Sequence, residues 1–286
     1  MKSRSPFETA ASFQGRYAFS MWCAMSSPAA NDQSRMTNQQ GPPSFAIVRM
    51  DDSDVDLAAV ARLMAEPLEL SVVDLIQVLP QRSGILADNL MQDVADRCAA
   101  NLGPGGIDVR AVPQSAVIEP PETVTLRSGR ADEEVFFYVA SDRKGAVKWP
   151  EVIWVDFVAV QEPSMEEFQD WDFRAQDGGT VRRFQARRFV TTQRLFADLV
   201  TYDPWLLLRI PLEGFEFAAT GLPMFPNRRQ NLTAFAATIA SRATAARLGI
   251  GMQWLESRSP PRENRMPSQA VYQGYLRWQL TRLFLK

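Results

Sequence analysis

The chain has 286 residues, of which 46% are hydrophobic and 22% are charged, and its formal net charge is −2. It contains no histidine, whereas average usage would give a chain of this length roughly half a dozen. The absence excludes the Ser–His–Asp triad, the Cys–His dyad, His-liganded zinc or iron, and the usual general base near pH 7.

The first 43 residues carry no hydrophobic periodicity, and after Met25 they are rich in Ser, Asn, Gln, Pro and Gly. This composition predicts a disordered arm over residues 1–43. Three explanations remain open for residues 1–35: a native arm, a weak transit peptide, or sequence ahead of a later start at Met21, Met25 or Met36.

Residues 44–113 have the pattern of a compact α+β domain that begins with a strand at 45–50. The four residues that follow include three carboxylates, which suit a helix N-terminus. Apolar residues at i, i+3, i+4 and i+7 over 57–64 predict a first helix, and we expect Pro67 to end it.

Two further helices are predicted in this domain. Ser71 starts the second, with an aspartate three residues later as in a capping box, and Pro80 is expected to end it. After a short extended piece at 84–86, Asp88 or Asn89 is expected to cap the third helix.

A Gly-rich turn from Gly103 leads to alternating apolar residues at 107, 109 and 111, which predict a closing strand. The complete order is β-α-α-β-α-β. It predicts a small βααβαβ-like sandwich in which three helices cover one face of a sheet.

Four features of this segment are shared with a known family: the helix-helix-turn-helix-strand order, the Leu68-x-Leu70 step, the helix end at Pro80 and the Gly-rich turn. By these features residues 45–113 resemble the C-terminal domain of the bacterial ribosomal stalk protein. In that family the surface of the two consecutive helices carries lysines that engage translation factors. Residues 44–113 contain no lysine. The resemblance therefore implies the same fold for this segment, but not the lysine surface that engages translation factors.

A Pro-rich stretch at 114–122 predicts a stiff linker, and the remaining residues, 123–286, form a β-rich pattern. An Asp-Gly-Gly turn at 177–179 predicts a hairpin between 171–174 and 181–190. Long helices are predicted at 227–248 and 268–285. The other predicted strands are 123–127, 135–140, 152–160, 205–210, 215–218 and 252–255.

The fold class expected is therefore α+β: the small sandwich followed by a β-rich domain, either a barrel or a sheet, with a long helix. Pleckstrin-homology-like folds have this kind of architecture, and the analogy carries no function with it.

An arginine cluster is the best candidate for a surface that binds a ligand or partner. Alternation along the strand at 181–190 places Arg183 and Arg187 on one face and Arg182 and Arg188 on the other. Guanidinium groups bind phosphate, nucleic acid or an acidic protein. We favour the alternative that the strand is a solvated face paired with acids across the sheet or with the acidic N-terminal domain. The full candidate set is Arg182, Arg183, Arg187, Arg188, Arg174 and Arg194.

Carboxylate pairs need no histidine for hydrolysis. Asp156 is the most informative candidate, because it interrupts an apolar strand, and only a buried carboxylate there would have a functional pKa. We favour a position on the solvent face or in a salt bridge. The other carboxylates considered are Glu133, Glu134, Glu166, Glu167 and Asp172.

No phosphate-binding loop or nucleophile elbow occurs, so we expect no catalytic residue, no metal site and no cofactor. The two cysteines, Cys23 and Cys98, lie far apart in the sequence, and we expect no disulfide partner. The longest apolar runs are too short to span a membrane, and no signal peptide is evident, so a cytoplasmic location is expected.

The leading functional hypothesis is a non-enzymatic, protein-binding adaptor protein. One alternative is a carboxylate-based hydrolase in the β-rich domain, metal-assisted or not. A second alternative is an RNA- or ribosome-associated protein that uses the arginine-rich strand.

Overall fold

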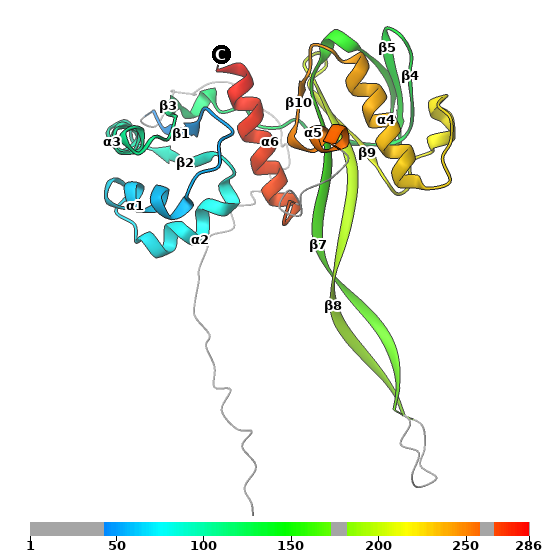
Figure 1. Ribbon diagram of the computed structural model, residues 1–286, viewed down its shortest axis with the longest axis horizontal. Coiled ribbons are helices and arrows are strands. Elements are labelled where there is room, and N and C mark those ends of the chain that lie inside the picture. Colours follow the sequence, from blue (N-terminus) through cyan, green and yellow to red (C-terminus); the bar gives the residue numbers. More distant parts are fainter. Residues whose placement is uncertain (1–42, 173–181, 258–265, 286) are drawn as a thin grey trace, which may run out of the picture. The chain divides into compact units, whose positions relative to one another are not determined.

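The computed structural model describes residues 43–172, 182–257 and 266–285 (Figure 1). They all belong to one compact unit, Pro42–Lys286. The described chain contains helices and two β-sheets, which confirms the predicted α+β class.

A three-stranded antiparallel sheet in the order β2-β1-β3 forms the first part of the fold, and its helices follow the predicted order. Its strands are β1 (Phe45–Arg49), β2 (Ile85–Leu90) and β3 (Val109–Pro113). Its helices are α1 (Leu57–Leu68), α2 (Val72–Arg82) and α3 (Gln92–Leu102).

The predicted cap of α2 is confirmed, whereas two helix boundaries differ from the prediction. Ser71 accepts a hydrogen bond from the Asp74 backbone N–H (3.1 Å). The helix continues past Pro80 to Arg82, because proline removes one N–H but has a φ angle that suits a helix. Helix α3 begins after Met91 because β2 continues to Leu90, and Asp88 instead forms ion pairs with two arginines.

The second sheet has seven strands in the order β10-β7-β8-β9-β4-β5-β6. Its neighbouring strands are antiparallel, except that β4 pairs in parallel with β9 and β10 with β7. The strands are β4 (Thr123–Ala131), β5 (Val135–Ala140), β6 (Lys144–Lys148), β7 (Val152–Asp172), β8 (Arg182–Thr201), β9 (Leu206–Pro211) and β10 (Arg247–Leu248).

Three helices accompany this sheet: α4 (Arg228–Arg242), α5 (Ile250–Ser257) and α6 (Gln269–Phe284). The start at Asn227 and the C-terminal helix were predicted correctly. Two predicted strands are wrong: residues 217–220 form a 3₁₀ turn, and 252–255 lie within α5. The long predicted helix ends at Arg242, because the chain then returns to the sheet edge as β10.

Both faces of the seven-stranded sheet are covered. Val155 and Phe157 of β7 share a core with Phe235 of α4. Trp154 and Val158 alternate with them and pack in a second core with α6. That second core also contains Val48 and Ile85 of the three-stranded sheet, so α6 packs between the two sheets.

Residues 114–122, predicted to be a linker, pack against α6. Val117 is buried in the core that α6 shares with both sheets. The Ile118 N–H donates to Thr281 Oγ1 (3.0 Å), and Glu119 forms an ion pair with Arg277 (2.7 Å).

The hairpin of β7 and β8 continues as a two-stranded ribbon beyond the pairing of its neighbours (Figure 1). Strand β9 pairs with β8 only from Phe196 to Thr201, and β10 pairs with β7 only at Trp154 and Val155. Residues 161–172 and 182–193 are called the β-ribbon below. The predicted hairpin is confirmed, and its connecting residues lie outside the described ones.

Candidate functional site

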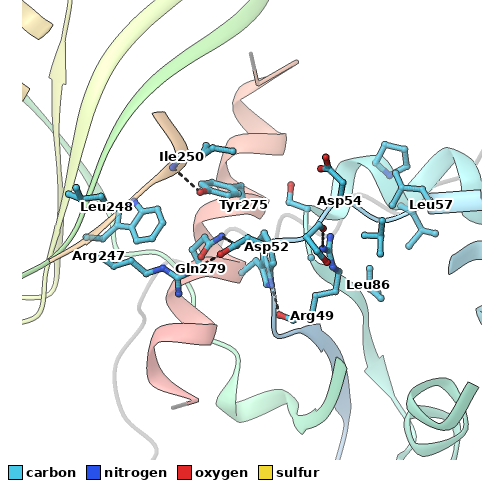
Figure 2. A pocket seen from close by; sticks show the side chains of 18 residues that line it. Arg49, Asp52, Asp54, Leu57, Leu86, Arg247, Leu248, Ile250, Tyr275 and Gln279 are labelled. Atoms are coloured by element: carbon cyan, nitrogen blue, oxygen red, sulfur yellow. Dashed lines mark hydrogen bonds and ion pairs between the residues drawn. The ribbon is translucent and has the colours of Figure 1, made fainter. Parts of the chain in front are cut away.

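A cavity of about 440 Å³ lies where the β1–α1 loop, the end of α2, β10 and α6 meet (Figure 2). This volume falls within the range of about 300–1,000 Å³ that is typical of small-molecule sites. The cavity's apolar lining includes Leu248, Ile250, Trp154 and Tyr275 near β10 and α6, and Leu79 of α2. The polar lining contains two arginines and two aspartates, so the cavity combines an apolar wall with a small number of charged groups.

Asp52 is the centre of the charged lining. Its carboxylate accepts hydrogen bonds from Arg247 (2.9 Å), from Gln279 (2.8 Å) and from Arg282. Partial burial opposes ionisation of Asp52, but the hydrogen bonds from Arg282 and Gln279 and the charges of Arg282 and Arg247 outweigh it and lower its pKa. Asp52 therefore stays ionised and connects the β1–α1 loop to α6 and β10.

Trp278 fixes the position of α6 against the three-stranded sheet. Its indole N–H donates to the Arg49 carbonyl (2.7 Å), and the guanidinium carbons of Arg49 and Arg282 lie 5.4 and 4.9 Å from its ring centroid. A Cβ atom on Gly84 would lie 2.2 Å from this ring. Gly84, with a φ of 146°, therefore allows the indole to lie directly on the backbone.

Three nitrogen donors of the cavity's residues are buried without a hydrogen-bond partner in the described part of the chain: Arg49 Nε, Arg247 Nη1 and Trp154 Nε1. Buried N–H groups are normally paired, and leaving one unpaired costs about 1–3 kcal/mol. In Figure 2 the side chains of Arg247 and Arg49 lie on opposite sides of Asp52. Three residues that line the cavity thus carry buried donors that no other described residue satisfies.

Asp156 is buried, with 1% of its surface exposed, and its described partners are backbone N–H groups, so neither the expected solvent-face position nor the expected salt bridge is found among the described residues. The reason is that α6 and α5 cover the sheet face on which alternation places it. Its carboxylate accepts from the backbone N–H groups of Gly251 (2.9 Å) and Phe157 (2.9 Å). Burial raises its pKa to about 8, although these hydrogen bonds favour the charged form.

Asp198 lies directly across the sheet from Asp156 and is equally buried. Arg209 on β9 binds it with two parallel hydrogen bonds, Nε to Oδ1 (2.8 Å) and Nη2 to Oδ2 (2.7 Å). The Arg209 guanidinium also lies 3.9 Å from the ring centroid of Phe196. This bidentate pair is a structural ion pair of the core, and neither it nor Asp156 lines the cavity.

The predicted arginine cluster lies on the β-ribbon, away from the cavity. Strand register places Arg188 opposite Glu166 and Arg187 opposite Glu167. Arg182 pairs in register with Asp172. This register agrees with the favoured alternative of acids across the sheet, because opposite charges in facing positions stabilise a strand pair.

The remaining cluster members separate from this group. Arg183 lies opposite Trp171 in the strand register. Arg194, at the base of the β-ribbon, forms an exposed ion pair with Glu162 (2.9 Å). Arg174 lies outside the described residues.

Sequence reasoning missed the cavity residues Arg49, Asp52, Arg247 and Trp154. They come from segments up to about two hundred residues apart, and no local motif joins them. One local signal was present: Gly249 and Gly251 flank a single residue just after β10, and such small residues often mark a close backbone approach.

Other chemistry is limited within residues 43–172, 182–257 and 266–285. This part of the chain holds no cluster of three or more Cys, Asp or Glu side chains that could bind a metal ion. Its helices are too short or too polar to cross a membrane. Cys98 is a free, buried thiol, and burial raises its pKa to about 11.

Comparison of the chain with protein-family models, with curated proteins and with solved structures finds no match. The structure and its physical chemistry are therefore the basis for the function proposed below.

Proposed function

We propose that the protein is a non-enzymatic, cytoplasmic adaptor protein that binds another protein through the β-ribbon. The observation that carries the proposal is the length of β7 and β8 beyond their sheet neighbours. In the described part of the chain, β9 pairs with β8 only from Phe196 to Thr201, so the strand order shows no neighbour for the outer edge of residues 182–189. Such an edge presents backbone N–H and C=O groups to which an extended segment of a partner can add as a strand.

Charge along the β-ribbon defines the chemistry of this partner. The β8 portion contains four arginines and no acid, whereas the β7 portion contains five acidic residues and no base. A strand that adds beside β8 would lie next to the arginines. The partner segment is therefore an extended, acidic peptide stretch of another protein.

A second copy of the chain fits this edge less well. A two-fold pair of β8 edges would bring arginines beside arginines, and like charges on neighbouring strands are destabilising. A head-to-tail pairing of β8 with β7 would match charges but would not close, so it predicts filaments.

RNA or ribosome binding, the second alternative, is also less favoured. The acidic residues of β7 face the arginines of β8 in register and weaken any purely electrostatic contact. An added peptide strand also gains backbone hydrogen bonds along the edge of β8, whereas a phosphate backbone does not. The carboxylate-hydrolase alternative would rest on Asp156, and it is less favoured because Asp156 does not line the cavity and its carboxylate is already held by backbone N–H groups.

The test is site-specific photocrosslinking of the full chain in cells, with the crosslinker at Thr191 on the exposed base of the β-ribbon. A matched position, Arg97 on α3, serves as the control. We expect one discrete protein adduct from Thr191 and none from Arg97. The crosslinked protein is then purified and its affinity for the full chain measured at two salt concentrations.

Charge reversal decides whether the β-ribbon makes the contact. We expect the double variant R187E/R188E to lower the affinity at least tenfold, and the matched variant R97E/R127E to leave it unchanged, because both control residues are exposed and lie outside the β-ribbon. Amides of residues 182–193 should also exchange hydrogen more slowly in the complex. Equal affinity for both double variants, adducts with RNA alone, or self-adducts alone would each overturn the proposal.

A further inference from the structure

The cavity beside α6 has three features of a built ligand site, and they do not depend on the β-ribbon. It has a suitable volume, an apolar wall and buried donors without partners. Trp154 is 1% exposed, and its indole N–H is a donor only, so no rearrangement of its own proton can satisfy it. The guanidinium groups of Arg247 and Arg49 are likewise donors only.

Arg247 is held in place for binding. One of its terminal nitrogens donates to Asp52 (2.9 Å), while the other, Nη1, is buried and has no partner in the described chain. Asp52 is itself fixed by Gln279 and Arg282 from α6. The free N–H groups of Arg247 are therefore oriented before a ligand arrives, which reduces the entropy lost on binding.

The arginines around Asp52 favour an anion because some of their buried N–H groups are unused. Three guanidinium groups (Arg49, Arg247 and Arg282) lie near three carboxylates, of which Asp51 and Asp52 form ion pairs with them and Asp54 lines the cavity. Asp52 and Asp54 are exposed to solvent, whereas Arg49 Nε and Arg247 Nη1 are buried without a partner in the described chain. N–H groups of arginine bind oxyanions through short, charge-assisted hydrogen bonds.

The apolar wall defines the rest of the ligand. Trp154 and Tyr275 stand edge to face, with ring centroids 6.1 Å apart, and Leu248 and Ile250 lie beside them. Tyr275 is fixed because its hydroxyl accepts from the Ile250 N–H (3.2 Å) (Figure 2). A flat aromatic or compact aliphatic body would pack well on such a surface.

We propose that this cavity binds a small organic anion, in which a carboxylate or phosphate accepts hydrogen bonds from Arg247 and Trp154 and an apolar body packs against Trp154 and Tyr275. This site is separate from the surface proposed for protein binding. It would make the junction between α6 and the β1–α1 loop responsive to a metabolite.

The experiment measures ligand binding to the full chain with four compounds: benzoate, phenyl phosphate, inorganic phosphate and the neutral analogue benzamide. Titration calorimetry should show saturable one-to-one binding of benzoate or phenyl phosphate, at least tenfold tighter than benzamide. At saturating ligand the melting temperature should rise by about 2–4 °C. The benzoate and phenyl phosphate arms distinguish a carboxylate ligand from a phosphate ligand, and the inorganic phosphate arm shows how much the apolar body contributes.

Two variants assign the binding to the cavity. W154F keeps an aromatic ring and removes the indole N–H, and R247Q removes the guanidinium charge; each should weaken binding at least tenfold. R194Q, which changes an exposed arginine at the base of the β-ribbon, should leave it unchanged. Circular dichroism shows whether R247Q folds. If it does not, W154F alone decides the test.

Failure of all four compounds to bind would overturn the proposal and would mean that the free donors bind water only. Binding that persists in W154F and R247Q would also overturn it. Because R187E/R188E leaves the cavity intact, it should bind the anion normally. The ligand site and the proposed protein-binding surface can thus succeed or fail separately.

Discussion

Asp156 and Asp198 face each other on neighbouring strands, both almost fully buried, and the fold satisfies them in two different ways. Arg209 forms two charge-assisted hydrogen bonds with Asp198, from the adjacent strand. Asp156 instead accepts backbone N–H groups, one of them at the start of α5. A buried carboxylate can thus be matched by a cation on the adjacent strand or by backbone N–H dipoles.

The contacts of Asp198 and Asp156 also require different backbone arrangements. The Asp198–Arg209 pair needs only two strands in register. The Asp156 contact needs α5 to approach β7 so closely that a Cβ atom on Gly249 would lie 2.1 Å from the Asp156 carboxyl carbon. The first arrangement depends on one arginine, and the second depends on glycines.

Removing the Arg209 guanidinium should have the largest effect on the free energy of unfolding. In R209M, Asp198 would remain as an uncompensated buried charge, and we expect the free energy of unfolding to fall by about 3–5 kcal/mol, measured by urea denaturation. The double variant D198L/R209M should recover part of this loss, because an apolar pair needs no charge compensation. A loss below about 1 kcal/mol in R209M would show that Asp198 does not depend on Arg209.

Adding a side chain where α5 contacts β7 should have the next largest effect on the free energy of unfolding. In G251A the new Cβ would lie 1.5 Å from the Phe157 carbonyl oxygen, so α5 must move and Asp156 must lose the hydrogen bond from the backbone N–H of residue 251. We expect a loss of about 1–3 kcal/mol in the free energy of unfolding. G103A is the matched control, since a Cβ there meets nothing within 4 Å, and its stability should barely change.

The protonation of Asp156 should give a smaller effect that depends on pH. Its folded-state pKa of about 8 lies above the usual value of 3.8. Between these two values the folded state binds more protons than the unfolded state, so stability should fall as the pH rises from about 4 to 8. D156N cannot ionise and should lose this decline, which denaturation at pH 5 and pH 8 would reveal.

The wild type and D156N share the neighbouring groups Tyr272 and Tyr275, whose pKa values burial raises, so the difference between the two proteins reports on Asp156. Equal changes between the two pH values in D156N and in the wild type would contradict a raised pKa for Asp156.

A surface ion pair should have the smallest effect. Arg194 and Glu162 form a pair in which the arginine side chain is 70% exposed. In R194Q we expect a change of less than about 1 kcal/mol, because exposed pairs gain little in water. A loss comparable with that of R209M would mean that burial is not what separates the two kinds of pair.

Much of the fold was predictable because its signals are local. Strand β5 and helix α6 follow apolar periodicity, and Ser71 and Asn227 cap helices as their side chains suggest. The β7–β8 hairpin was predicted, but its length was underestimated. Its outer part is rich in charged residues, so it lacks the apolar alternation that marks a strand in the sequence.

The remaining features depend on contacts between distant segments. Alternation places Asp156 on one face of β7 but cannot show that α6 covers that face. Strand β10 has two residues, and its pairing with β7 is what makes it a strand. The cavity joins Arg49, Asp52, Arg247 and Trp154 through tertiary packing alone, so none of these could be assigned from its neighbours in the sequence.

The contact of Trp278 with Gly84 and Arg49 has a consequence for folding during synthesis, because its two sides are made at different times. Trp278 follows Arg49 by 229 residues, which at about 5–20 residues per second corresponds to roughly 10–50 s of synthesis. During this interval the nascent three-stranded sheet has no α6 to cover Val48 and Ile85. Translation rate therefore sets how long this apolar surface is open to chaperones.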